Sequence, residues 1–412
     1  MTKSSWGILW VAFSAGVVAT LIQFSIPPVL PVLQAQFELT YMNSALFMSL
    51  FALTTIVSAV PGGFIVQKYG ERFVGLLGLG ALIVGVLCSL FAGNFAFFLF
   101  ARIIQGIGFG FVSVAAPSAI GRFIPAHMMN VSMGIWSTWI PVGSLMMFLF
   151  APYLVSTFNT GTYWSILLLI LVGSFILYAK RIPGGSAESK NESLGERVPR
   201  NAIKKEIRNK RVWVAAGTFA SFTFSLFAFN TWISTYLVES SSMSLAHAAV
   251  IPGLVSFFMI GSNVCGGFLL KKFGDHPLLF GLPPLLMALI WPMFLIDHSI
   301  VLYGSAIVLG TIGGITPTIL FASAPILAKR KETIGIAMSI IIVGENAGIL
   351  IGPEVFGILR DYTNHFNASF WSLFCGGLIT VIASISVWRS WKVRSAEGQI
   401  LEEELVLDKT HQ

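Results

Sequence analysis

The sequence predicts an all-α membrane protein with twelve transmembrane helices, arranged as two pseudo-symmetric six-helix bundles. Its composition excludes an ordinary soluble protein, because 55% of the residues are apolar and only 10% are charged, whereas soluble domains carry roughly 25% charged residues. Apolar runs of about 20 residues, long enough to cross about 30 Å of hydrocarbon, recur along nearly the whole chain. The two halves of the chain also repeat each other's features at one fixed spacing.

The repeat is clearest at a basic, glycine-rich turn. Residues 62–71 read GGFIVQKYGE, and 204 residues later (266 − 62) residues 266–275 read GGFLLKKFGD. At the same offset, Gly106 and Gly110 match Gly310 and Gly314. Two matches at one spacing favour an internal duplication, and duplicated bundles of membrane helices are typical of secondary transporters.

The apolar runs predict the helices in order, because continuous segments of this length satisfy their backbone groups in lipid as helices rather than as short alternating strands. In the first half we expect spans at 6–33, 42–66, 74–93, 95–120, 131–155 and 162–180. In the second half we expect spans at 212–238, 246–270, 277–296, 299–326, 333–359 and 367–391. The first run is too long for a signal peptide and contains Pro27, Pro28 and Pro31, so we expect it to be retained.

The remaining segments divide the chain into domains. We expect a first bundle over residues 1–180, a cytoplasmic linker over 181–210, a second bundle over 211–392 and a cytoplasmic tail over 393–412. The linker begins with a Pro-Gly-Gly-Ser sequence, which favours a boundary. Its second part places Ile203 and Ile207 four residues apart among basic residues, which indicates either a short helix on an anionic leaflet or a flexible, positively charged linker.

The basic residues predict the topology. If both termini are cytoplasmic, the inner loops hold Lys68, Arg72, Arg122, the cluster at 180–211, Lys271, Lys272 and residues 329–331, and the outer loops hold almost none besides Arg360. This asymmetry follows the positive-inside rule. We therefore expect a multi-pass protein of the cytoplasmic membrane. The excess of basic residues is explained by this topology, so we expect no nucleic-acid partner. We also expect the protein to be a monomer.

The turn after the second span carries a family resemblance. Gly63, Lys68, Gly70 and Arg72 fit a Gly-x-x-x-x-Lys-x-Gly-x-Arg pattern, and with the two six-span halves and the central loop they resemble the major facilitator superfamily over nearly the whole chain. The resemblance implies that these four residues belong to a cytoplasmic gate. Gln67 stands where the family usually has an Asp, so an acidic latch is not expected at this position. Physically, the glycines allow close helix packing and a tight reversal, and the cations anchor the loop in the cytoplasm.

The fourth predicted span contains Arg102, Gln105 and Gly106, which resemble the superfamily's Arg-x-x-Gln-Gly pattern on a cavity-lining helix. A charge inside a span costs roughly 3 kcal/mol or more unless it meets water, a partner or a ligand. We therefore expect Arg102 to be a charge of the substrate cavity with Gln105 on the same face, and the alternative is a structural pairing or snorkelling.

The eleventh predicted span contains two acids. Glu345 lies close to the stripe formed by Gly344, Gly348 and Gly352, whereas Glu354 points to the opposite side. Because Glu345 is near mid-span, we expect it to carry the coupled proton. The alternatives are a permanent partner of Arg102 or an interhelical hydrogen bond.

Further candidates for substrate contacts are polar or aromatic residues in spans that are expected to face a central cavity. They are Gln23, Trp136, Trp139, Asn230, Trp232 and Tyr236. The sequences around Trp139 and Trp232 are similar to the cyanate and nitrate/nitrite porter branch of the superfamily, without the glycine-dense signatures of nitrate porters.

These features predict a secondary active transporter that moves a small anionic solute by alternating access and couples it to protons. The alternative is a proton-coupled exporter of lipophilic or cationic compounds. A membrane-embedded enzyme is not expected, because no His and acid share a span at ligand spacing and the three cysteines lack metal or disulfide spacing. We accordingly expect no metal and no cofactor.

Overall fold

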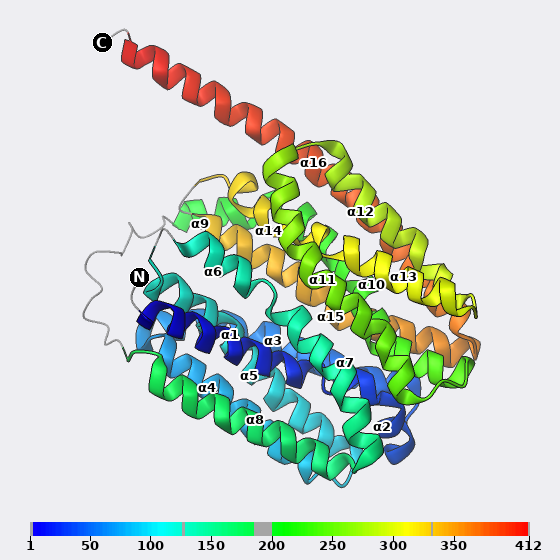
Figure 1. Ribbon diagram of the computed structural model, residues 1–412. Helices are drawn as coiled ribbons and strands as arrows, with labels where there is room; N and C mark the ends of the chain where they lie inside the picture. Colours follow the sequence, from blue (N-terminus) through cyan, green and yellow to red (C-terminus); the bar gives the residue numbers. More distant parts are fainter. Residues whose placement is uncertain (1–2, 126–127, 185–199, 331–332, 411–412) are drawn as a thin grey trace.

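The computed structural model describes residues 3–125, 128–184, 200–330 and 333–410, and it is almost entirely helical. In Figure 1 the first half of the chain forms one group of helices and the second half forms another beside it. The first half consists of α1 (Lys3–Gln23), η1 (Pro27–Val29), α2 (Leu30–Phe37), α3 (Tyr41–Tyr69), α4 (Glu71–Leu90), α5 (Phe95–Phe123), α6 (Met129–Trp136), α7 (Trp139–Thr157) and α8 (Thr160–Arg181).

The second half follows a short linker helix, α9 (Arg200–Ile207). It consists of α10 (Lys210–Ser240), α11 (Leu245–Phe273), α12 (Pro277–Ile290), η4 (Trp291–Leu295), α13 (Ser299–Gly313), α14 (Ile315–Leu327), α15 (Ile334–Thr363) and α16 (Phe366–Thr410). Within the described residues, twelve segments are long and apolar enough to cross a membrane, which confirms the predicted number of spans. Of the two alternatives for the second part of the linker, the structure has the short helix, at Arg200–Ile207, and residues 185–199 lie outside the described residues.

We call the side on which α1 begins and α16 leaves the bundle the termini side, and the other the opposite side (Figure 1). Four helices that start on the opposite side carry a polar N-cap, whose side-chain oxygen accepts a hydrogen bond from a backbone N–H three residues later. These caps are Thr40, Asn94, Asn159 and Ser244. Each cap satisfies a donor that the helix itself leaves unpaired, so these residues fix where the spans begin.

Several spans that the sequence predicts as single helices are broken. The first span changes from α1 to η1 at Pro27 and Pro28, which lack the N–H needed to continue a helix. The fifth span is interrupted at residues 137–138, where Pro141 cannot donate to the carbonyl of Ser137. The tenth is interrupted at Gly314, three residues before Pro317. Proline therefore accounts for each interruption.

The internal duplication is visible in how equivalent glycines pack. A Cβ added at Gly106 would meet the carbonyl of Phe51, and one added at Gly310 would meet that of Val255. Gly310 and Val255 each lie 204 residues after their counterparts Gly106 and Phe51 (310 − 106 and 255 − 51), which is the offset of the sequence repeat. Glycine is required at both places because the neighbouring helices α3 and α11 approach α5 and α13 closely enough to leave no room for a side chain.

The two halves meet mainly through α3 against α15, α7 against α11, and the broken part of the first span against α10. On α15, Leu350 and Asp361 lie on the stripe that faces α3, since both accept hydrogen bonds from it. Ser339 and Val343 continue the same stripe toward the termini side and are exposed. The halves are thus joined on the opposite side and parted toward the termini side along this helix.

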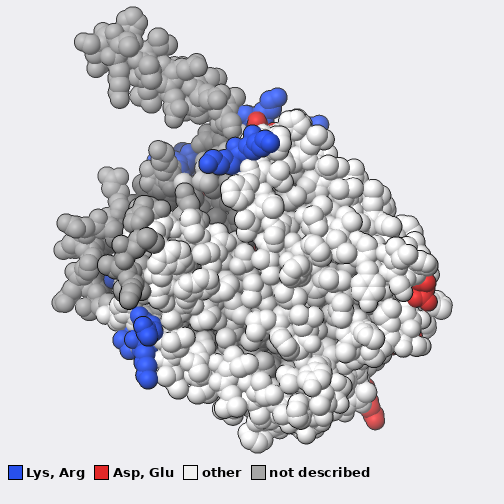
Figure 2. Space-filling view, viewed as in Figure 1, with Lys and Arg blue, Asp and Glu red and all other residues white. Residues whose placement is uncertain are grey.

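Charge is distributed as a membrane protein requires. Figure 2 shows Lys and Arg on the termini side, Asp and Glu mostly on the opposite side, and a broad uncharged surface between them. The uncharged surface includes many exposed apolar side chains, among them Phe64, Leu169, Phe268 and Ile382. Such a belt is the surface that a bilayer covers.

Candidate functional site

Arg102 lies inside the first bundle with no exposed surface. Its Nε donates to the carbonyl oxygen of Phe47 at 2.9 Å, and its Nη1 donates to the carbonyl oxygen of Ile22 at 3.0 Å. A further Nη1 bond reaches Oε1 of Gln105 at 2.8 Å, and Nη2 lies 3.4 Å from the carbonyl oxygen of Gln23. The guanidinium therefore binds carbonyl and amide oxygens instead of a carboxylate.

The partners of Arg102 exist because the first span is broken. α1 ends at Gln23, so the carbonyls of its last turn carry the negative end of the helix dipole. Arg102 caps two of them. The carbonyl of Ile22 also accepts hydrogen bonds from the backbone N–H and the hydroxyl of Ser25. Among the described residues no acidic side chain forms an ion pair with Arg102. Its charge is stabilised by carbonyl and amide dipoles and by the Phe51 ring, whose centroid lies 4.4 Å from the guanidinium carbon. In this conformation Arg102 is enclosed beside the break and does not line an open cavity.

Gln105 links this cluster to α4, because its Nε2 donates to the hydroxyl oxygen of Ser89 at 2.9 Å. The prediction that Gln105 shares a face with Arg102 is therefore met by a direct bond between the two side chains. Its amide is fully buried and is committed to Arg102 and Ser89. Gln105 thus helps to fix the orientation of the Arg102 guanidinium by linking it to Ser89 on α4.

Unpaired polar atoms gather on the two central helices that meet at the interface. Gln23 at the end of α1 and Asn230 on α10 are 4% and 7% exposed, and Oε1 of the first and Oδ1 of the second have no hydrogen-bond partner among the described residues. The hydroxyl oxygens of Ser234 and Thr235, also on α10, are likewise buried without a partner in the described part of the chain. Such groups are rare in folded proteins because each costs about 1–3 kcal/mol.

The break that follows Gln23 contacts α10 across the interface. The rings of Phe24, next to Gln23, and Phe227, one turn before Asn230, have centroids 5.7 Å apart. Asn230 and Ser234 are four residues apart and share a face of α10 with Phe227. The geometry thus brings the polar groups of Gln23, Asn230 and Ser234 to the region where the two bundles meet.

The predicted tryptophans have packing partners of their own. Trp139 stacks between Phe109 and Trp136, with centroids 5.4 and 4.8 Å away, although the helix breaks between the two tryptophans. Trp232 is fully buried on α10, donates from Nε1 to the carbonyl oxygen of Pro353 at 3.0 Å and stacks on Phe356. Trp232 therefore ties α10 to α15, and Trp139 lies in a separate aromatic stack against α1.

Glu345 lies on α15 and is half-buried. Its carboxylate makes no hydrogen bond or ion pair with any described residue, and only its backbone oxygen accepts one, from Thr223 at 2.7 Å. A permanent pair with Arg102 is therefore absent in this conformation. The stripe of Gly344, Gly348 and Gly352 packs directly on α10, because a Cβ at any of them would overlap α10 backbone atoms.

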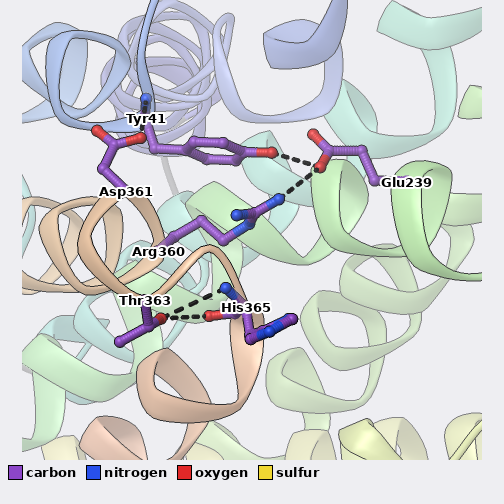
Figure 3. A network of polar contacts seen from close by, with 6 residues as sticks. All are labelled: Tyr41, Glu239, Arg360, Asp361, Thr363 and His365. Atoms are coloured by element: carbon purple, nitrogen blue, oxygen red, sulfur yellow. Dashed lines mark hydrogen bonds and ion pairs between the residues drawn. The ribbon is translucent and has the colours of Figure 1, made fainter.

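A polar network closes the opposite side (Figure 3). The Asp361 carboxylate on α15 accepts hydrogen bonds from the backbone N–H of Tyr41 at 3.1 Å and of Met42 at 2.8 Å, the first two residues of α3. The Tyr41 hydroxyl donates to Glu239 on α10, and Arg360 lies 3.7 Å from the same carboxylate. The Arg360 guanidinium also lies 4.6 Å from the centroid of the Tyr41 ring.

Because Tyr41 belongs to the first bundle and the acids to the second, this network joins the two halves. An anionic carboxylate at a helix N-terminus is stabilised by the helix dipole and by charge-assisted hydrogen bonds. The sequence analysis missed Asp361, Glu239 and Tyr41. The only sequence feature that pointed to this network was the presence of the acids Glu239 and Asp361 near the ends of two spans.

The glycine-rich turn on the termini side is built largely as the sequence predicts. Gly70 has φ of 86°, a conformation that favours glycine, and it separates α3 from α4. Lys68 and Arg72 are exposed. Gly63 differs from the expectation of close packing, since a Cβ there would meet nothing, whereas one on Gly62 would meet the Phe111 ring.

The acid at this turn is Glu71, which the sequence analysis did not single out. Its Oε2 accepts a hydrogen bond from Nη1 of Arg122 at 2.9 Å, and its backbone oxygen accepts one from the Tyr178 hydroxyl at 3.2 Å. Glu71 is the first residue of α4, where a negative charge is favourable. It ties the termini-side ends of α4, α5 and α8 within the first bundle.

No group of three or more His, Cys, Asp or Glu side chains in the described part of the chain could hold a metal ion.

Residues 12–353 match the family model of the Major Facilitator Superfamily.

Curated relatives cover nearly the whole chain at low identity. The hexuronate transporter of Bacillus subtilis (strain 168) is 24% identical over 94% of this chain and 95% of its own length. The probable sulfoacetate transporter SauU of Cupriavidus necator is 24% identical over 87% of each chain. Both matches cover most of the relative and most of this chain.

Solved structures show the same fold. A bacterial homologue of the human lysosomal transporter Spinster, in an inward-facing and unoccupied conformation, superposes with a TM-score of 0.76 at 15% identity, covering 95% of this chain and 98% of that one. A D-xylose–proton symporter superposes with a TM-score of 0.76 at 16% identity, covering 94% and 98%.

Proposed function

The chain belongs to the major facilitator superfamily, and we propose that it is a secondary transporter that moves a small organic anion together with protons. Secondary transport rests on the family and on the full-length relatives. The finer proposal rests on one observation about Arg102. It is a buried cation with no acidic partner among the described residues, and it lies next to polar groups at the interface of the two bundles that lack a hydrogen-bond partner among those residues.

The site favours an anion for electrostatic reasons. Arg102 holds the backbone of Gln23 and is neutralised by no carboxylate among the described residues, so the Gln23 side chain lies in a positive field. Gln23, Asn230 and Ser234 offer amide and hydroxyl groups, which can donate to carboxylate or sulfonate oxygens. The names of two relatives, a hexuronate and a sulfoacetate transporter, also denote organic anions. Arg102 acts here through its field and by fixing Gln23, while Trp139 and Trp232 are held in contacts of their own and support the helices around the site.

Alternating access follows from the way the halves are joined. The network of Tyr41, Glu239 and Asp361 holds the opposite side closed, and the α15 stripe is exposed toward the termini side. We propose that the termini side is cytoplasmic, as the Lys and Arg residues there require, and that the protein lies in the cytoplasmic membrane. Gly70, Lys68 and Arg72 then belong to the cytoplasmic gate. One chain contains both halves, so a monomer suffices.

Proton coupling is assigned to Glu345, whose half-buried carboxylate has no protein partner among the described residues. Uptake of one negative charge against 100 mV, inside negative, costs about 2.3 kcal/mol, so anion uptake requires at least one accompanying proton to be electroneutral.

The test is transport by the full-length protein in proteoliposomes with an internal pH dye, over a panel of hexuronates, short sulfonates and lipophilic cations. We expect proton movement with an anion, and at least a tenfold loss of it in Gln23→Leu or Asn230→Leu, because each removes polar atoms at the site. Ser174→Ala is the matched control, since it removes a buried, unpaired hydroxyl of α8 away from the interface. Proton movement driven by a cation and by no anion would instead establish the exporter.

A further inference from the structure

The linker helix α9 is docked firmly onto the second bundle. Glu206 is fully buried, and its carboxylate accepts hydrogen bonds from Nδ2 of Asn209 at 2.7 Å, the backbone N–H of Lys329 at 2.9 Å and the hydroxyl of Thr333 at 2.8 Å. Thr333 is the N-cap of α15. A buried carboxylate with three donors holds its helix in one orientation, so α9 presents a defined outer face.

The depth of α9 is set by a tryptophan. Nε1 of Trp213, in the first turn of α10, donates to the carbonyl oxygen of Ile207 at 2.7 Å. Both side chains are about half exposed, 48% for Trp213 and 49% for Ile207. An exposed indole at the end of a span lies at the boundary between hydrocarbon and headgroups. The end of α9 is therefore fixed at headgroup level.

Basic side chains surround this point. Lys204, Lys205, Arg208 and Lys210 are exposed, and none of their side chains forms an ion pair with a described residue. They are exposed on the termini side, within the same short stretch of chain as Ile207 and Trp213. Basic residues beside an interfacial apolar pair are the combination that binds an anionic lipid surface, at about 1 kcal/mol per cation.

We propose that α9 and the first turn of α10 form a headgroup site for anionic phospholipids. The anionic phosphodiester contacts Lys204, Lys205 and Arg208, and the acyl chains lie along Ile207 and Trp213. The site is separate from the transport pathway and does not depend on the transported substrate.

The test uses the full chain in phosphatidylcholine vesicles that contain about a fifth of brominated phosphatidylglycerol or, for comparison, brominated phosphatidylcholine. Bromine quenches nearby tryptophans, and subtracting the signal of Trp213→Phe isolates Trp213. We expect brominated phosphatidylglycerol to quench Trp213 about threefold more than the neutral lipid, because three cations enrich the anionic lipid locally. The substitutions K204Q, K205Q and R208Q together should abolish the excess.

The matched control is K271Q, K272Q and K392Q, which removes the same charge from exposed residues on the same side of the protein and should keep the excess. Glu206→Ala should also lower the excess quenching, because the cations remain but α9 loses the hydrogen bonds that hold it on the second bundle. The proposal fails if both lipids quench equally in the parent, or if the control triple loses the excess as fully as the α9 triple. An excess that appears only after removal of residues 394–412 would show that the tail covers this face, and would also overturn it.

Discussion

Removing the charge of Asp361 should open the opposite side of the molecule. Asp361→Asn keeps an oxygen that can accept one hydrogen bond but loses the negative charge at the N-terminus of α3. Hydrogen bonds to charged groups contribute about 1.5–3 kcal/mol against 0.5–1.5 for neutral ones, and the helix dipole adds about 0.3–1 kcal/mol. Because the site is partly exposed, the net loss is about 1–2 kcal/mol. Since these bonds join the halves, that loss favours the state open on this side about 5- to 30-fold.

The assay is the accessibility of a residue sealed by the network. Ser234 is fully buried on α10, and Ser234→Cys in a background without the three native cysteines provides a single thiol. A membrane-impermeant maleimide added to vesicles from the opposite side reacts in proportion to the open population. The labelling rate should therefore rise by the same 5- to 30-fold factor in Asp361→Asn.

The control removes a carboxylate from the same side without touching the interface. Asp297 accepts a hydrogen bond from Ser241, and both residues belong to the second bundle. Asp297→Asn should leave the labelling rate unchanged. If Asp361→Asn also labels at the parental rate, the network does not hold the halves together and the reasoning is wrong.

Three further predictions follow from the same geometry. Arg102→Met removes the charge-assisted hydrogen bonds to the carbonyls of Ile22 and Phe47 and leaves the buried Oε1 of Gln105 without this donor, so it should lower the free energy of unfolding by about 3 kcal/mol or more, visible as a lower Tm in detergent. Gly348→Ala should cost about 1–3 kcal/mol because its Cβ overlaps the Ala220 carbonyl, whereas Gly335→Ala meets open space and should not lower Tm. Glu345→Gln should abolish substrate-driven proton movement but retain exchange of substrate across the vesicle membrane, and retained proton movement would remove Glu345 from the mechanism.

The number and order of the spans could be predicted from the sequence because apolar length is a local property. The packing of Gly344, Gly348 and Gly352 on a neighbour was also predictable, since three glycines on one stripe have few other uses. The breaks in the first, fifth and tenth spans were missed because hydropathy does not register that proline lacks the backbone N–H of a helical hydrogen bond. Pro141 and Pro317 were nevertheless the available signal.

Residues whose role depends on a distant partner could not be predicted in the same way. Ser234 and Thr235 look like ordinary small polar residues of an apolar span, and they stand out only because their buried hydroxyls pair with nothing in the part of the chain that the structure describes. Glu206 reads as one charge in a basic linker, yet it is fully buried against the start of α15. The sequence placed Arg102 in a span correctly, but its partners arise from the end of α1, a break that the sequence analysis did not locate.

α15 gives a physical reason why these separate features act together. It is one unbroken helix whose start is bonded to α9 through Thr333, whose middle carries Glu345 and whose end carries Asp361. Glu345 and Asp361 lie about 24 Å apart along its axis, at 1.5 Å per residue. The glycine stripe and Trp232 fix α15 to α10, so the two helices form a stiff pair, while the first span opposite them is broken at Pro27 and Pro28. A change of charge at Glu345 can therefore reach the Asp361 contacts as a movement of the rigid pair against the first bundle, and no chain of rearranged side chains is required.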